Sequence, residues 1–159
     1  MTATATEVGD LLMVRGLSLA TAESCTGGRL GDKITGVPGS SDYFMGGVVS
    51  YSNHAKVDLL GVDPKLIDSK GAVSEEVAIE MADGARERFH TDIGVGITGI
   101  AGPSGGSAMK PVGLVYIAVS SDESNMCTKN NFSGGRSEVK EQATNMALQV
   151  LKEFIEKEF

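Results

Sequence analysis

The chain has 159 residues, of which 41% are hydrophobic and 22% charged, and its 21 acidic against 14 basic side chains give a formal net charge of −7. This length predicts one domain, residues 1–159, and the acidic balance argues against a protein that binds nucleic acid through its phosphate backbone. No apolar run approaches the ~20 residues that cross a bilayer, which excludes a membrane-spanning protein.

The number of glycines indicates a local structural requirement, and the cysteines indicate the redox environment of the protein. Glycine makes up 21 of the 159 residues, nearly twice its average share of ~7%, so some local feature must require it. The two cysteines, Cys25 and Cys127, match no zinc-ligand spacing, and the chain does not open with a basic segment followed by an apolar one. We therefore expect a reduced, cytoplasmic protein.

The first half of the chain alternates between helix and strand patterns. A short amphipathic helix is expected to end at Gly16, because glycine readily adopts the left-handed conformation that stops a helix. The segments that follow are predicted as a strand over Leu17–Ala22, a helix over Gly28–Thr35, a strand over Phe44–Ser50, and a short helix from an N-cap at Asn53 through Leu60.

The second half has clearer patterns. Ser74 is expected to cap a helix that runs to Phe89, and another amphipathic helix begins at about Ser137. Buried strands are predicted over Ile93–Ile97 and Leu114–Ser120, and an edge strand over Met126–Phe132. Strands interleaved with helices predict an α/β fold, a three-layer α/β/α sandwich with a mixed, mostly parallel sheet of about five strands. The short link between the last two strands predicts a hairpin, and therefore one antiparallel strand.

The densest polar segment, Thr21–Gly28, lies between the first predicted strand and the next helix. In α/β sheets, ligands bind beyond the carboxyl ends of strands, where helix N-termini present free N–H groups. The Ser24 hydroxyl is therefore placed for nucleophilic attack. A second interpretation, which this segment alone favours, is that Ser24 and Thr26 only cap the helix.

A serine nucleophile requires a base, which is usually histidine. The chain has only His54 and His90, and both are expected to be solvated at helix ends. Lys56 is an alternative, because burial or a neighbouring cation lowers a lysine pKa from ~10.4 toward neutrality. Lys56 and Tyr51 follow the second strand, so both side chains are candidates for the same sheet edge as Ser24. Composition alone favours a solvated Lys56.

A glycine-rich segment, Gly94–Gly106, begins in the third predicted strand. Its glycines formally match the dinucleotide-binding pattern, but they fall within the strand, and Gly102-Pro103 follows where that motif needs a helix. Lys110 lacks the neighbours of a Walker A lysine. Two interpretations stay open: an N–H nest for an anion or a flat ring, and an ordinary surface loop.

Two features mark the start of the last helix. Ser137 and Lys140 match the S-x-x-K signature of penicillin-binding proteins, but the companion motifs are missing, and Ser137 is expected to be a helix cap. Arg136 stands with free N–H groups at the helix N-terminus, which suits a carboxylate or phosphate, although a solvated arginine is equally common.

Six blocks, taken together and in this order, resemble the CinA C-terminal domain family. The blocks are Ala22–Gly28, Gly39–Ser41, Tyr51–Asn53 with Lys56, Gly71–Ser74, Thr98–Pro103 and Lys110–Gly113. The resemblance covers about residues 6–155. The chain therefore looks like a standalone version of the domain, without the molybdopterin-binding-like domain that often precedes it in the family.

The resemblance implies nicotinamide-nucleotide amidase activity, in which the carboxamide of nicotinamide mononucleotide is hydrolysed to nicotinate mononucleotide and ammonia in pyridine nucleotide salvage. Ser24 falls on the family's nucleophile position, and Lys56 and Tyr51 fall on positions assigned to activating it. Arg136 matches a basic position in a segment that usually reads Gly-Asp-Arg. Gly135 stands here in place of the acidic residue.

The expected mechanism follows from these positions. Neutral Lys56, assisted by Tyr51, takes the proton of Ser24 as Ser24 attacks the amide carbon. The N–H groups expected to hold the oxyanion are those of Cys25, Thr26, Gly27 and Gly28. The residues expected to bind the rest of the substrate are Thr98, Gly99, Ala101 and Gly102 for ring and ribose, with Arg136 or Lys110 near the phosphate. No metal or cofactor is required.

Two other functions stay open at this point. One is a module that binds a nucleotide or a protein partner in a competence or damage response without turnover, and the other is a serine hydrolase of a different amide. The resemblance and the apolar faces of the terminal helices imply a homo-oligomer, a dimer or larger. The glycine excess is expected to serve the site, where the backbone must approach a flat, anionic ligand closely.

Overall fold

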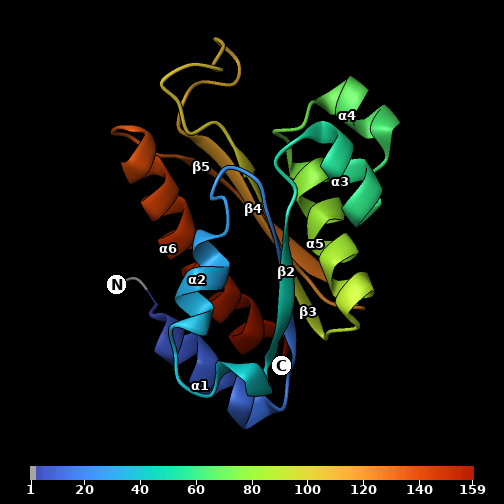
Figure 1. Ribbon diagram of the computed structural model, residues 1–159, viewed down its shortest axis with the longest axis vertical. Helices are drawn as coiled ribbons and strands as arrows, with labels where there is room; N and C mark the ends of the chain where they lie inside the picture. The colour runs from blue at the N-terminus through green and yellow to red at the C-terminus, as the bar shows by residue number, and fades with distance from the viewer. Residues whose placement is uncertain (1–2) are drawn as a thin grey trace.

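A five-stranded mixed sheet runs through the centre of the computed structural model, which describes residues 3–159 (Figure 1). Its strands, in the spatial order β2-β1-β3-β4-β5, are β1 (Leu19–Glu23), β2 (Phe44–Val49), β3 (Ile93–Gly99), β4 (Leu114–Ser120) and β5 (Asn125–Asn131). β1 pairs in parallel with β2 and β3, whereas β4 is antiparallel to both β3 and β5. The prediction of one antiparallel strand and of β5 at an edge is therefore confirmed.

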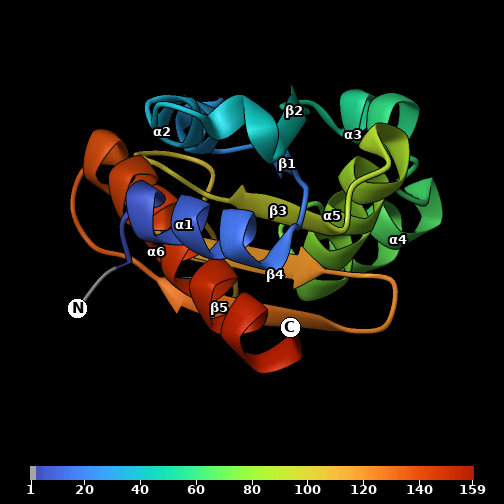
Figure 2. The ribbon, with the colours of Figure 1, turned by 90° about the horizontal axis from the view of Figure 1, so that it is seen from below.

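Helices cover both faces of this sheet (Figures 1 and 2). They are α1 (Ala5–Arg15), α2 (Arg29–Thr35), α3 (Asn53–Leu60), α4 (Pro64–Lys70), α5 (Glu75–Phe89) and α6 (Arg136–Glu158), with a 3₁₀ turn η1 (Ser40–Asp42). α5 packs on β1, β3 and β4, with α3 and α4 beside it, while α1, α2 and α6 lie on the opposite face. Within residues 3–159, no helix is both long enough and apolar enough to cross a bilayer.

The helix boundaries confirm part of the cap predictions. Gly16 ends α1 in the left-handed conformation, and the Ser74 side chain caps α5 by accepting a hydrogen bond from Val77 N. Two predicted caps are wrong. Ser52, rather than Asn53, caps α3. The N-cap of α6 is Gly135, two residues before the expected Ser137, and the Glu138 carboxylate accepts the N–H of Gly135 at this first turn.

The short helix α4 was not predicted from the sequence. Its start follows ordinary rules, since Asp63 caps it and Pro64 stands in its first turn. None of its seven residues is fully buried. Its apolar residues Leu66 and Ile67 are partly buried against the core, but a helix of seven residues is too short to show a clear apolar period in the sequence.

The largest core cluster lies between the sheet and the helices α1, α2 and α6. It includes Leu12, Leu30, Val95, Ile117 and Leu151, all fully buried. On the opposite face of the sheet, Gly94 and Gly96 of β3 lie directly against α5. A Cβ atom at either position would collide with a helix carbonyl, that of Ala82 or Ala78. These two glycines therefore allow close packing of α5 on the sheet, which corrects the expectation that they approach a ligand.

Replacing Gly96 with alanine tests this packing. We expect Gly96→Ala to lower the free energy of unfolding by about 1–3 kcal/mol, because α5 must shift away from β3 to admit the methyl group. Urea denaturation followed by circular dichroism measures the change. Gly36→Ala is the matched control, since Gly36 has helical φ (−67°) and its new Cβ would meet no atom closer than 3.4 Å. Equal stability of the two variants would contradict the packing role.

Candidate active site

A cavity of about 300 Å³ opens beyond the carboxyl ends of β1, β2 and β3, beside the start of α6. Its walls contain nine of the residues that the sequence analysis selected, namely Ser24, Cys25, Tyr51, Lys56, Thr98, Gly99, Ala101, Gly102 and Arg136. Thr26, Gly27, Gly28 and Lys110 are not among the lining residues. The segment between β3 and β4, which projects beyond the sheet in Figure 1, supplies one wall.

Ser24 and Lys56 meet at the floor of this cavity. Ser24 is the first residue after β1, and Lys56 lies in the first turn of α3, 32 residues later. Lys56 Nζ is 3.0 Å from Ser24 Oγ, 2.9 Å from the carbonyl oxygen of Ser50 and 3.3 Å from that of Tyr51. A neutral amine has two hydrogens and one lone pair. Donation to the two carbonyls leaves the lone pair for the hydroxyl hydrogen of Ser24.

The surroundings of Lys56 favour this neutral form. Its side chain is 1% exposed, so charging the amine would require an ammonium ion out of contact with water. Among residues 3–159, no carboxylate forms an ion pair with it. Burial therefore lowers the pKa of Lys56 below its ordinary value of 10.5. The solvated lysine favoured by composition alone is wrong.

The Tyr51 phenol forms no hydrogen bond with Ser24 or Lys56. Tyr51 is 64% exposed, and its hydroxyl oxygen accepts a hydrogen bond from Arg136 at 3.1 Å. The only Tyr51 atom bonded to Lys56 is the main-chain carbonyl oxygen. This geometry assigns the contact of Tyr51 with Lys56 to its backbone, and places its side chain at the rim of the cavity.

Glu23 organises the loop that carries Ser24, and its role was not predicted. We call residues 24–28 the nucleophile loop. The Glu23 carboxylate is 2% exposed and accepts hydrogen bonds from four donors: Thr26 Oγ1 at 2.6 Å, and the N–H groups of Leu30, Gly31 and Gly28 at 2.9, 3.0 and 3.2 Å. A carboxylate just before a helix start is the available sequence signal, because acidic groups satisfy the free N–H groups there.

These hydrogen bonds narrow the choice of oxyanion donors in the nucleophile loop. The N–H of Gly27 donates to the carbonyl of Ser24, and that of Gly28 donates to Glu23. The N–H groups of Cys25 and Thr26 donate to no oxygen within the described part of the chain. Of the four donors expected from the sequence, only Cys25 and Thr26 are therefore free to hold a developing negative charge.

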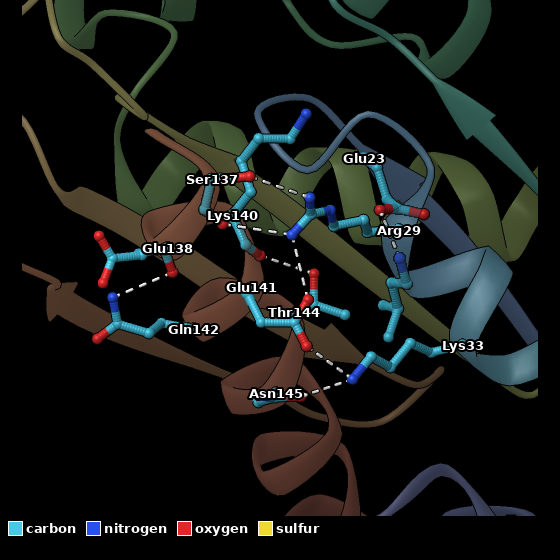
Figure 3. Close-up of polar contacts among 11 residues, drawn as sticks. Glu23, Arg29, Lys33, Ser137, Glu138, Lys140, Glu141, Gln142, Thr144 and Asn145 are labelled. Atoms are coloured by element: carbon cyan, nitrogen blue, oxygen red, sulfur yellow. Dashed lines mark hydrogen bonds and ion pairs between the residues drawn. The ribbon is translucent and has the colours of Figure 1, made fainter. Parts of the chain in front are cut away.

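A clamp of charged side chains holds α2 against α6 (Figure 3). Glu141 accepts from Arg29 at 3.1 Å and from Lys33 at 2.8 Å, and Arg29 also donates to the carbonyl of Ser137. The hydrogen bond from Lys33 is the main reason that the pKa of Glu141 lies below its ordinary value. The clamp fixes the nucleophile loop, which precedes α2, beside the first turn of α6.

Arg136 lines the cavity, whereas Lys110 does not. Arg136 donates to the carbonyl oxygen of Gly102 and to Tyr51, so its guanidinium spans the cavity rim. Lys110 instead reaches away from the cavity and donates to the carbonyl oxygen of Lys70 at the end of α4. The lining residues that the structure describes include Arg136 and the buried Lys56 but no carboxylate. A cavity with the charge of Arg136 at its rim and no carboxylate suits an anionic ligand.

Known proteins resemble this chain in sequence and in structure. A family model described as the CinA C-terminal domain matches residues 1–155. A CinA-like protein of Acidobacterium capsulatum is 52% identical over 141 residues, which cover 89% of this chain and 34% of that protein. The chain spans about a third of the length of the curated relatives that it matches.

Two solved structures resemble the chain over nearly their whole length. A CinA superfamily protein from Klebsiella pneumoniae has 33% identity and a TM-score of 0.93, with 96% of each chain covered. The competence/damage inducible protein CihA from Agrobacterium tumefaciens has 36% identity and a TM-score of 0.87, with 98% of each chain covered.

The Glu23 hydrogen bonds generate a prediction about the nucleophile loop. We expect Glu23→Gln to lower the free energy of unfolding by about 1–3 kcal/mol, because the amide nitrogen cannot accept and leaves a buried N–H unsatisfied. Urea denaturation measures this loss. Glu156→Gln is the control, since Glu156 is exposed on α6 and forms no ion pair within residues 3–159. A loss for Glu23→Gln no larger than for Glu156→Gln would show that the buried bonds do not organise the loop.

Proposed function

The chain belongs to the CinA C-terminal domain family, and on that premise we propose that it is a nicotinamide-nucleotide amidase that acts on nicotinamide mononucleotide. The observation that carries this proposal is the 3.0 Å contact between Ser24 Oγ and the buried amine of Lys56. A hydroxyl beside a neutral amine is the arrangement required for acyl transfer without histidine.

The chemistry begins with proton transfer from Ser24 to Lys56. As the Lys56 lone pair accepts the hydroxyl proton, Ser24 Oγ attacks the carboxamide carbon and the carbonyl π electrons move to oxygen. The N–H groups of Cys25 and Thr26 stabilise the resulting oxyanion, because they have no other acceptor in the described residues. The product of this step is a tetrahedral intermediate bonded to Ser24.

The second half of the reaction returns the proton. Protonated Lys56 donates it to the carboxamide nitrogen, the C–N bond breaks, and ammonia leaves as the carbonyl reforms on an acyl-enzyme. Water then attacks the acyl carbon, gives its proton to Lys56, and releases nicotinate mononucleotide while Ser24 Oγ recovers a proton. Every step uses the same amine in alternate protonation states, which requires a pKa near the working pH.

The rest of the cavity supports binding of a mononucleotide. Arg136 is the basic group at the rim, so we assign the phosphate to its guanidinium in preference to Lys110, which lies outside the cavity. The wall formed by Thr98, Gly99, Ala101 and Gly102 presents mainly backbone, and we assign it to the ring and ribose. The volume of about 300 Å³ is at the lower end of small-molecule sites, which suits a single nucleotide.

An ammonia assay tests the proposed function. Purified protein with nicotinamide mononucleotide should release ammonia in amounts equal to nicotinate mononucleotide. Ser24→Ala should lower kcat by roughly 10³-fold or more, because no other hydroxyl of residues 3–159 forms a hydrogen bond with Lys56 Nζ. Ser69→Ala is the matched control, since Ser69 is exposed on α4.

Three outcomes would contradict parts of this proposal. No ammonia from the intact chain, together with binding of the nucleotide, would favour the non-catalytic nucleotide-binding module. Undiminished turnover by Ser24→Ala would remove Ser24 as nucleophile. Equal kcat/KM for nicotinamide riboside, which lacks the phosphate, would remove the assignment of Arg136.

The buried Lys56 predicts the pH dependence of the activity. Because burial lowers the pKa of Lys56, kcat/KM should rise with pH through that lowered pKa and level off above it, where the amine is neutral. Lys56→Arg should lose at least about 100-fold in kcat at every pH, since guanidinium stays protonated. A pH–rate profile from pH 5 to 10 measures both effects. A flat profile between pH 6 and 9 would rule out Lys56 as the titrating base.

A further inference from the structure

A second basic side chain, that of Lys140, lies beside the nucleophile loop. Lys140 stands on α6 one turn after Arg136, so both project from the same helix face. A Cβ atom built on Gly27 would lie 3.6 Å from Lys140 Nζ. Figure 3 shows the Lys140 side chain extended along the start of α6 toward this loop.

The charge of Lys140 is not neutralised by a neighbouring carboxylate. Arg29 and Lys33, the other cations at this contact, both pair with Glu141. Within residues 3–159, the Lys140 amine forms no ion pair and no hydrogen bond. Its full charge therefore acts on the nucleophile loop, whose effective dielectric is below that of water.

Lys140 also acts on the Cys25 thiol. Burial and, to a smaller extent, the Glu23 carboxylate raise the pKa of Cys25 to about 11, whereas the charge of Lys140 acts in the opposite direction and favours a negative charge there. Cys25 is also one of the two residues of this loop whose N–H groups have no acceptor in the described residues. A negative charge that develops at this point of the loop would be stabilised by the same cation.

We propose that Lys140 is an electrostatic positioning residue for amide hydrolysis, whose unpaired charge stabilises the oxyanion held by the N–H groups of Cys25 and Thr26. This inference rests on the proposed function. Lys140 does not line the cavity, so it acts through the loop and does not touch the substrate. Its contribution belongs to the transition state, where the negative charge appears, and should leave ground-state binding unchanged.

Kinetics of two substitutions test this role. Lys140→Met keeps the aliphatic stem and removes the charge, so kcat should fall roughly three- to tenfold with KM within about twofold. Lys140→Arg should retain most of the activity because it keeps the charge. The control is Lys157→Met, an exposed lysine near the other end of α6. An unchanged kcat in Lys140→Met would overturn the proposal, and a rise in KM alone would assign Lys140 to the phosphate instead.

A second measurement does not depend on turnover. In a Ser24→Cys background, the introduced thiol serves as a probe of the local field, and its pKa is read from thiolate absorbance as a function of pH. The native thiols do not interfere, since burial raises the pKa of Cys25 to about 11 and that of Cys127 to about 12. We expect Lys140→Met to raise the pKa of the introduced thiol by about 0.5–1 unit.

The two measurements separate the possible failures. An unchanged thiol pKa would overturn the role of Lys140 whatever the activity. A raised thiol pKa in a protein that releases no ammonia would uphold the field at the loop and reject the amidase function on which its catalytic use depends. A fall in kcat with no change in thiol pKa would identify a structural effect and also overturn the proposal.

Discussion

Burial of the Lys56 amine is the constraint on which the rest of the site depends. An ammonium ion held out of water without a carboxylate partner is costly, so the protein lowers this cost by favouring the neutral amine. The two carbonyls that accept its hydrogens come from the turn between β2 and α3, and they direct its lone pair toward Ser24. A surface lysine at the same distance from a serine would stay protonated and could not serve as a base.

The surrounding structure holds the other half of the pair in place. Glu23, at the end of β1, binds four donors of the segment that follows, and the contacts of Arg29 and Lys33 with Glu141 hold that segment to α6. Ser24 therefore stands on a loop in which the N–H groups of Ser24, Gly27 and Gly28 donate hydrogen bonds, whereas those of Cys25 and Thr26 have no acceptor in the described residues. Two basic side chains at the start of α6 lie near this loop. Arg136 lines the cavity, and the Lys140 amine lies beside Gly27.

Sequence patterns predicted the fold better than they predicted the role of glycine. The five strands, the hairpin and the two longest helices carry strong periodicity, because each buries one face or both. α4 is short and has no fully buried residue, and it was not predicted. Gly94 and Gly96 were expected to contact a ligand because they precede the glycine-rich segment that follows β3. In the structure they lie against the backbone of α5, which packs on this face of the sheet. Sequence spacing does not reveal which helix crosses a given strand.

The sequence by itself determined the alternation of strands and helices, the placing of polar residues after strand ends, and the resemblance that selected Ser24 and Lys56. Tertiary structure alone decided which of these residues meet. The order of strands in the sheet brings Ser24 and Lys56 together across 32 residues, turns the Tyr51 phenol toward Arg136, and leaves Lys110 outside the cavity. The physical reason is that burial depends on packing between distant segments, and burial is what lowers the pKa of Lys56 below that of a surface lysine.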